Sequence, residues 1–350
     1  MKLHIALLAA SFSFLLSCGS ELPPNVIIVH VDDLGWTDLG CFGSGYYETP
    51  HIDRLAGGGM SFTNAYAAAA VCSPSRAALL TGQYPARLGI TDWIRASFNA
   101  DAWEPGTPIP EFESVGSRRL STPVNQPYLP HGEITIAEHL KPSGYVTAHI
   151  GKWHLGREDW FPDSQGFDYN IGGCDFGQPP SYFDPYQNER VQGIPTLPPR
   201  REGEYLTERE GDEAVEFIRS HKDEAFFLYY APYAVHTPIQ AKPAVEARYE
   251  AKVKTNQTNP AYAAMVESVD DAVGRIMATL EELKLAERTL VLFTSDNGGL
   301  MRVTDNAPLR DGKGSPYEGG IRVPLIAWWP GNIPPGTQSD APISSIDYFP

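Results

Sequence analysis

The sequence predicts an α/β fold in which helices cover both faces of a large, mostly parallel sheet. The first observation is a set of short apolar runs rich in β-branched residues, which are typical of strands buried on both faces. The second is that amphipathic helical patterns separate these runs. The third is the content of glycine (32) and proline (31), spread over 350 residues without a period. It indicates many shaped loops, and the length allows one large domain or two smaller ones.

The elements follow from these patterns in chain order. We predict buried strands at Asn25–Val31, Tyr145–Ile150, Ala225–Ala231, Thr289–Thr294 and Val323–Trp328. Apolar side chains near helical spacing predict helices at Ile134–Leu140, Glu204–Ser220 and Tyr262–Leu285. Pro74 suits the first turn of another helix that ends near Thr81, before Gly82. Thr91–His131 and Trp160–Arg201 lack periodicity but contain many aromatic residues, so we expect ordered loops that shape a pocket.

The first residues have the pattern of an export signal. Met1-Lys2 precedes a short apolar run that ends at Leu16, and Ser17-Cys18 follows. The run is too short to span a bilayer, which needs ~20 apolar residues. Leu15–Gly19 resembles a bacterial lipoprotein processing site, at which Cys18 would become the lipidated first residue. We therefore predict a signal peptide over residues 1–17, a lipidated Cys18 with a short linker to residue 23, and one domain over residues 24–350. Export to a bacterial periplasm or cell surface follows, with the lipid as membrane anchor. The alternative is ordinary signal cleavage with Cys18 as a bystander.

The charge balance argues against nucleic acid as a partner. The chain has 27 basic and 43 acidic residues, for a net charge of −16. No net positive field is present to offset repulsion from phosphates. Local arginines and lysines remain able to form an anion pocket.

Polar side chains follow four of the predicted strands. They are Asp32 and Asp33, Lys152 and His154, His236, and Asp296 with Asn297. Open α/β sheets place their sites at the carboxyl ends of strands. Each cluster alone is typical of a turn or a surface residue, but the four together predict a site.

The acidic members of this set predict a metal. Asp32, Asp33, Asp296 and Asn297 offer hard oxygen ligands, which suit Ca²⁺ or Mg²⁺, and the spacing of cysteines and histidines does not fit zinc. Without a cation, three converging carboxylates would repel one another.

A third pattern is Cys72–Arg76, with the sequence CSPSR, followed by AALLTG. It places Cys72 at a helix N-terminus, where backbone N–H groups favour an anion. The run resembles the signature of type I sulfatases, in the alkaline phosphatase superfamily. Gly151–Gly156 (GKWHLG) resembles the second signature of that family, and Asp32-Asp33, His236, Asp296-Asn297 and Lys313 occur in the family's order.

The resemblance implies a chemistry for each matched position. Cys72 would be oxidised by a maturation enzyme to Cα-formylglycine, whose hydrate attacks sulfur with one hydroxyl and expels sulfate with the other. Ca²⁺ would be held by Asp32, Asp33, Asp296, Asn297 and the modified Cys72. Arg76 would hold the aldehyde hydrate and a carboxylate, and Lys152 and Lys313 would neutralise sulfate oxygens. His154 would act as the base, and His236 as the acid toward the leaving oxygen.

The same resemblance predicts an alkaline-phosphatase-like sulfatase fold whose C-terminal antiparallel subdomain is missing, because the chain stops at Pro350. The substrate expected is a sulfated carbohydrate, with Trp93, Arg95 and His131 as candidate sugar contacts. Two alternatives stay open: a phosphonate or phosphate ester hydrolase of the superfamily, and an inactive glycan-binding lipoprotein. Cys41 and Cys174 either pair or remain buried thiols.

Overall fold

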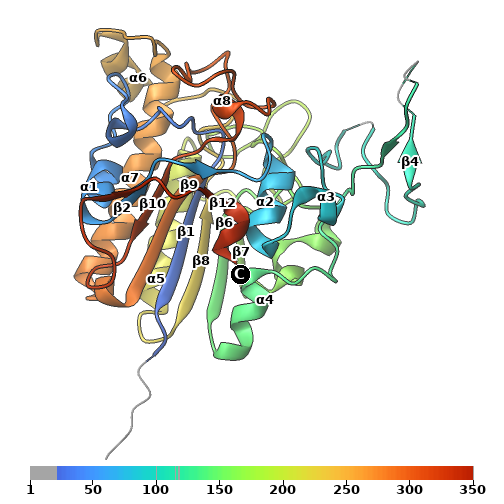
Figure 1. The fold of residues 1–350 in the computed structure, drawn as a ribbon, viewed down its shortest axis with the longest axis horizontal. Helices are drawn as coiled ribbons and strands as arrows, with labels where there is room; N and C mark the ends of the chain where they lie inside the picture. Colours follow the sequence, from blue (N-terminus) through green and yellow to red (C-terminus); the bar gives the residue numbers. More distant parts are fainter. Residues whose placement is uncertain (1–21, 100, 115, 117–118, 350) are drawn as a thin grey trace, which may run out of the picture.

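The structure is a computed structural model that describes residues 22–99, 101–114, 116 and 119–349. The predicted signal peptide and Cys18 lie outside these residues. An eight-stranded sheet forms the centre of the molecule, with strand order β11-β2-β10-β9-β1-β8-β6-β7 (Figure 1). The predicted α/β architecture is therefore present.

Five strands run parallel through the middle and one side of the sheet. They are β9 (Thr289–Ser295), β1 (Asn25–Val31), β8 (Phe226–Ala231), β6 (Val146–Gly151) and β7 (Tyr169–Ile171). β1 is the central strand, with Val26 opposite Phe227 of β8 and Leu290 of β9. Side chains of β1, β8 and β9 are almost all buried, which explains their continuous apolar sequence.

The fifth predicted strand differs in direction. β10 (Leu325–Trp328) runs antiparallel to β9 and to β2 (Met60–Phe62). A parallel return would need a crossover to the other end of the sheet. The chain between β9 and β10 instead stays near the end of β9 and contains only the one-turn helix α8 (Glu318–Ile321). The sheet is thus mixed, with β11 (Thr337–Ser339) parallel to β2 at its edge.

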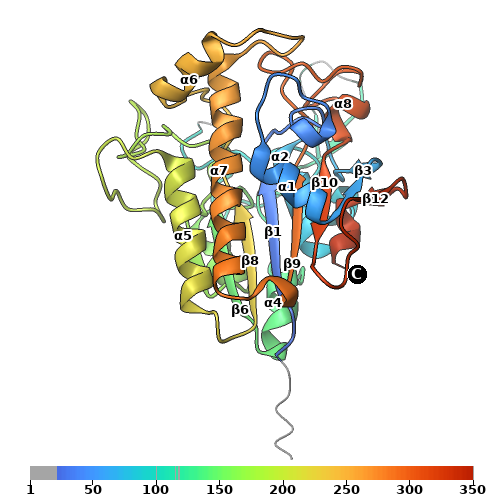
Figure 2. The same ribbon diagram turned by 90° about the vertical axis from the view of Figure 1, so that its left-hand side faces the viewer.

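Helices cover the two faces unequally. On one face lie α1 (Pro50–Gly58), α5 (Leu206–Ser220) and α7 (Pro260–Glu282), with α6 (Pro243–Glu250) beyond them (Figure 2). Asn259 caps α7 by accepting a hydrogen bond from the Tyr262 N–H, and Pro260 occupies the first turn. This cap starts the helix two residues earlier than the apolar pattern predicts.

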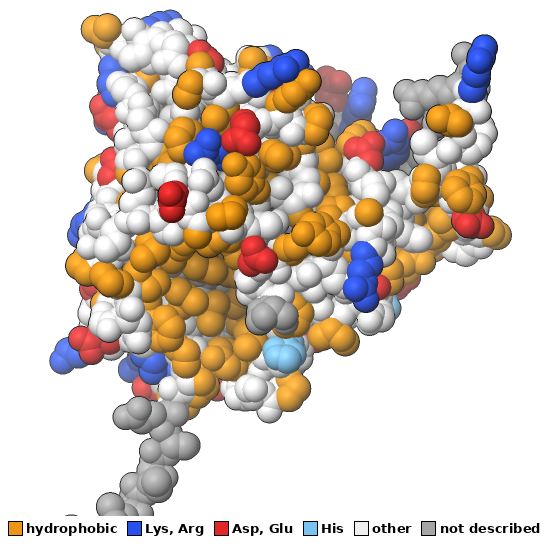
Figure 3. All heavy atoms as spheres, in the orientation of Figure 1, with side chains coloured by type: hydrophobic (Ala, Val, Ile, Leu, Met, Phe, Trp, Pro, Cys, Tyr) orange, Lys and Arg blue, Asp and Glu red, His pale blue; other side chains and the backbone are white. Residues whose placement is uncertain are grey.

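The opposite face carries α2 (Cys72–Thr81), α3 (Pro85–Leu88), α4 (Ile136–Leu140) and the final 3₁₀ helix (Ser345–Tyr348). These short helices leave part of the sheet uncovered. Val26, Leu290 and Leu292 share that face by register and are only half-buried. Figure 3 shows hydrophobic side chains gathered there, over β1, β9 and β10.

The first of the two long predicted loops, Thr91–His131, has little regular structure, but the second, Trp160–Arg201, contains β7, an edge strand of the main sheet that the pattern did not predict. The first holds only the small hairpin β4 (Phe112–Glu113) and β5 (Thr122–Pro123). Outside these loops, β3 (Ala65–Tyr66) pairs with β12 (Ile343–Ser344). Cys41 is exposed, Cys174 is buried, and both are free thiols, so the alternative of a disulfide between them is wrong. Within the described residues, no helix has the length and apolarity needed to cross a bilayer.

Candidate active site

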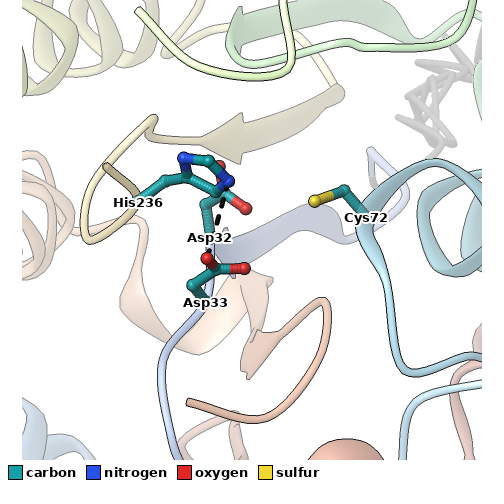
Figure 4. Close-up of side chains that lie close together, drawn as sticks. All are labelled: Asp32, Asp33, Cys72 and His236. Carbon is teal, nitrogen blue, oxygen red and sulfur yellow. Dashed lines mark ion pairs between the residues drawn. The ribbon is translucent and has the colours of Figure 1, made fainter. Parts of the chain in front are cut away.

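The site forms where the carboxyl ends of β1, β6, β8 and β9 meet the start of α2. Figure 4 shows Asp32, Asp33 and His236 on one side and Cys72 facing them from the helix N-terminus. Metal-binding atoms of these four residues all lie within 4.8 Å of one another. Asp32 and His236, which are 204 positions apart in the chain, therefore meet, as the strand-end clusters predict.

Two of these residues have strained backbones. Asp33 and His154 both have a φ of 61°, in the left-handed region that non-glycine residues rarely adopt. Asp33 lies two residues after the end of β1, and His154 lies three residues after the end of β6, so both turns are at the carboxyl end of the sheet. Such outliers persist where surrounding contacts fix them, and they gather at functional sites.

Cys72 is the first residue of α2 and is almost fully buried. Burial raises the pKa of its thiol, but the positive charges of Lys152 and Lys313 outweigh burial and lower that pKa to about 6. The position therefore stabilises negative charge on the side chain, in keeping with the helix N-terminus behind it.

Three buried carboxylates are each matched by a cation. Asp32 accepts from Lys152 Nζ at 2.7 Å, and Asp33 lies 2.7 Å from Lys313 Nζ. Asp296 Oδ2 lies 2.9 Å from Arg76 Nε and 2.8 Å from its Nη2. Although burial raises the pKa of Asp296, the Arg76 guanidinium outweighs it and holds that pKa far below the usual range.

The residues present fit a divalent cation. Asp32 Oδ1 and Asn297 Oδ1 are buried oxygens without a hydrogen-bond partner, and an oxygen in that state costs free energy unless something binds it. Burial also raises the pKa of Asp32 well above its ordinary value despite the nearby Lys152. A cation would satisfy both oxygens and favour the ionised carboxylate. Because the donors are oxygens, calcium suits them better than zinc.

His154 has a defined tautomer. Its Nε2 lies 2.7 Å from the Ile94 carbonyl oxygen, which only accepts, so Nε2 carries the proton and Nδ1 has a free lone pair. Nδ1 is buried and has no partner among the described residues. Burial, and then the charge of Lys152, lowers the pKa of His154 well below its ordinary value, so the ring is neutral. This is the state that a general base requires.

His236 has the opposite tendency. Burial lowers its pKa, but the negative charges of Asp33 and Asp32 outweigh burial and raise the pKa above that of ordinary histidine. Its Nε2 lies 2.9 Å from Lys313 Nζ and 3.5 Å from Asp33 Oδ2. A raised pKa favours the protonated ring, which is the form that a general acid requires.

A cavity of about 380 Å³ opens over these groups. Cys72, His154, His236 and Lys313 line it, whereas Lys152 and Arg76 lie beneath it and hold the carboxylates. The remaining lining residues are Val71, Trp93, Ile94, Ala96, Phe98, Asn99, Gly177, Gln178 and Arg190.

Of the three candidate sugar contacts, the structure brings only Trp93 to this cavity. Arg95 lines a neighbouring cavity and pairs with Asp101 at 2.5 Å. His131 stacks on Trp160 and is bonded to the Asp159 carbonyl, away from the lining residues.

Sequence reasoning missed Phe98, Gly177, Gln178 and Arg190, which come from the two long loops. Gly177 packs against the His154 ring so closely that a Cβ there would lie 2.6 Å from Cε1. No local pattern marks these residues, because loops without periodicity carry no signal of where their side chains point.

Comparison with known proteins identifies relatives along almost the whole chain. The sequence profile of the family named Sulfatase matches residues 24–350. N-acetylgalactosamine-6-sulfatase of the dog is 37% identical over 98% of this chain and 64% of its own length. Human arylsulfatase A is 34% identical over 98% of this chain and 67% of its own. The chain thus spans 62–64% of the first N-acetylgalactosamine-6-sulfatases it matches.

Solved structures agree with this. Ps i-CgsB in complex with k-i-k-neocarrahexaose superposes with a TM-score of 0.77 at 33% identity, covering 93% of this chain and 70% of that one. The sulfatase PsFucS1 of Pseudoalteromonas gives 0.73 at 29% identity, covering 93% and 66%. The predicted fold class is confirmed, and the chain belongs to the sulfatase family.

Proposed function

We propose that this protein hydrolyses sulfate esters of carbohydrates at the Cys72 site. The observation that carries the proposal is the cavity over Cys72: Lys313 and two histidines line it, and none of its described lining residues is acidic. Such a lining attracts an anionic ester and offers both an acid and a base. Membership of the sulfatase family supports the reaction class.

Two groups complete the proposed site. Asp32, Asp33, Asp296 and Asn297 would hold Ca²⁺, which supplies Lewis-acid polarisation of the sulfate and leaves the site with a surplus of positive charge. Cys72 would be converted to Cα-formylglycine, whose hydrate supplies one hydroxyl to attack sulfur and a second to release it. Because Cys72 is 3% exposed, we propose that the maturation enzyme acts before the chain folds.

The chain's own residues position the ester and move its protons. Lys313 lines the cavity and binds sulfate oxygens, with charge-assisted hydrogen bonds worth about 1.5–3 kcal/mol each. The hydroxyl that attacks sulfur would lose its proton as the bond from sulfur to the sugar oxygen breaks, and His236 would give its own proton to the sugar oxygen, so the two transfers balance. His154 Nδ1 takes the proton that the remaining hydroxyl loses when sulfate departs. Arg76 pairs with Asp296 and Lys152 pairs with Asp32, so both carboxylates are held in place.

A carbohydrate substrate is supported by the cavity and by the relatives. Trp93 and Phe98 are both large, partly exposed aromatics on its wall, and such rings pack against sugar faces. The relatives named above include N-acetylgalactosamine-6-sulfatases and a protein bound to k-i-k-neocarrahexaose.

The nearest alternative is a phosphonate or phosphate ester hydrolase. A phosphonate monoester hydrolase shares the fold, with a TM-score of 0.57 at 19% identity, but that likeness shows the fold alone. We expect kcat/KM for an aryl sulfate to exceed that for the matching aryl phosphate, and a panel of sulfated sugars to include substrates. The reverse order would favour the alternative. Sugar binding without any turnover, with Cys72 unmodified in the native host, would favour an inactive glycan-binding lipoprotein.

We also propose that Cys18 carries lipid and anchors the protein to a bacterial membrane at the periplasm or cell surface. Cys18→Ser should move the protein from the membrane fraction to the soluble fraction, because one thioether-linked anchor is lost. Fractionation and mass analysis of the N-terminal peptide measure this. A wild-type protein that is soluble and unacylated in its host would contradict the proposal.

A further inference from the structure

Arg190 lies where the cavity over Cys72, which we call the reaction cavity, meets two others. It lines the cavity over Cys72, a cavity of about 800 Å³ next to it, and a third of about 360 Å³. Phe98 is the one other residue that all three cavities share. A sugar chain that extends from the reaction cavity into either neighbour would therefore lie near Phe98 and Arg190.

The positive charge of Arg190 is not paired with any acidic side chain among the described residues. Its side chain is exposed, and its guanidinium makes no ion pair or hydrogen bond with the described residues. Lys313, the other basic residue of the lining, is held by Asp33. The nearby Arg157 is likewise held, in a bidentate pair with Glu104. The chain has a net charge of −16, yet this guanidinium lines the cavity without an acidic partner among the described residues, so it is available to bind an anion.

The loop that presents Arg190 is fixed by Asn188. The Asn188 side-chain oxygen accepts from the backbone N–H groups of Arg190 and Val191 at 2.9 and 3.0 Å. Its amide nitrogen donates to the Pro180 carbonyl, in the segment that also carries Gln178. The backbone of Arg190 is thereby tied to a wall of the reaction cavity.

The surrounding charges decide where an anion would bind. The 800 Å³ cavity beyond Arg190 is lined by four acidic residues: Glu158, Asp159, Asp163 and Asp175. The third cavity contains Glu189. The surplus of acidic residues disfavours an anionic group in the 800 Å³ cavity, whereas none of the described residues that line the reaction cavity is acidic. The guanidinium therefore favours an anion on its Cys72 side and a neutral sugar beyond it.

We infer that Arg190 is a specificity residue that binds a second anionic group, a sulfate or a carboxylate, close to the sulfate ester that is cleaved. The inference rests on the proposed sulfatase function and adds to it the substrate class: carbohydrates with two anionic groups on the same sugar or on directly linked sugars. Guanidinium groups bind sulfates and carboxylates alike through paired N–H donors.

The test compares Arg190→Gln with wild type on three disaccharides that share one cleavable sulfate. One has no other charge, one has a second sulfate, and one has a hexuronate neighbour. We expect KM for the two dianionic sugars to rise about ten- to a hundredfold in the variant, with a smaller change for the monoanionic sugar. The difference in KM between variant and wild type for the dianionic sugars should decrease at high salt, because salt screens an exposed charge contact. A rise with only one dianionic sugar identifies the group that Arg190 binds.

Arg302→Gln is the matched control, because Arg302 is an exposed arginine that lines none of these cavities. It should leave all three KM values unchanged. Asn188→Ala should reproduce the Arg190→Gln pattern to a lesser degree, because it frees the loop. Equal KM changes for all three sugars, or none, would overturn the inference. If no disaccharide is hydrolysed, the proposed function fails instead. Calorimetric binding of the same sugars to Cys72→Ala, with and without Arg190→Gln, then decides the inference.

Discussion

Replacing Cys72 by alanine is expected to reduce kcat for sulfate esters by at least about four orders of magnitude. The residue lies at the N-terminus of α2, within 4.8 Å of the carboxylates of Asp32 and Asp33, and it lines the cavity. The thiol itself is not expected to act, since a sulfated thiol has no internal route to release. Mass spectrometry of the peptide Ala67–Arg76 should show an aldehyde in active wild-type protein.

Two further variants sharpen this test. Cys72→Ser has one hydroxyl where the hydrate has two, so at best it should accumulate a sulfated serine without turnover. Cys174→Ala removes another buried thiol, whose pKa burial raises to about 12, and should retain activity. A highly active preparation in which Cys72 is wholly an unmodified thiol would refute the mechanism.

Removing calcium is expected to abolish activity, and adding it back should restore activity where zinc does not. Asp32 Oδ1 and Asn297 Oδ1, which accept no hydrogen bond from any described residue, then lose the cation that would bind them. Stability should respond as well: calcium at a hundred times its Kd adds about 2.7 kcal/mol to the free energy of unfolding. Thermal unfolding with and without the metal measures this independently of turnover.

Asp32→Asn should remove the calcium-dependent rise in Tm, because the amide weakens the ligand set. Asp340→Asn changes an exposed carboxylate far along the chain from the ligands and should leave that rise intact. Full activity in a sample verified to contain no metal would rule out the cation.

The sequence predicts most of the sheet and the strand-end residues, because both depend on local patterns. Apolar runs mark β1, β8 and β9, and the polar groups that follow a buried parallel strand emerge together at one edge. The direction of β10 depends instead on how far the chain travels after β9, which no run of residues records. The apolar pattern places the start of α7 at Tyr262, two residues late, because the helix start is set by the Asn259 cap and not by apolar side chains.

The sequence also does not indicate which lysine lines the cavity and which is buried beneath it. Lys152 and Lys313 carry the same charge, so the sequence does not distinguish their roles. Lys152 is fully buried and pairs with Asp32, whereas Lys313 lines the cavity. Burial depends on which loop lies above, and those loops lack periodicity. For the same reason the sequence does not indicate that Arg190 and Gly177 line the cavity.

The central position of β1 has a consequence for how the protein reaches its native state. Asn25 bonds to Thr289, 264 residues later, and Val26 pairs with Phe227 of β8. Closing loops of this length costs chain entropy before any pairing compensates for it, which slows folding. Asp32 and Asp33 meet their partners only after both neighbours of β1 have joined it. We therefore expect catalytic competence to arise late in folding, after most helices have formed, and newly made chains to spend that interval with the apolar strands unpaired and open to aggregation.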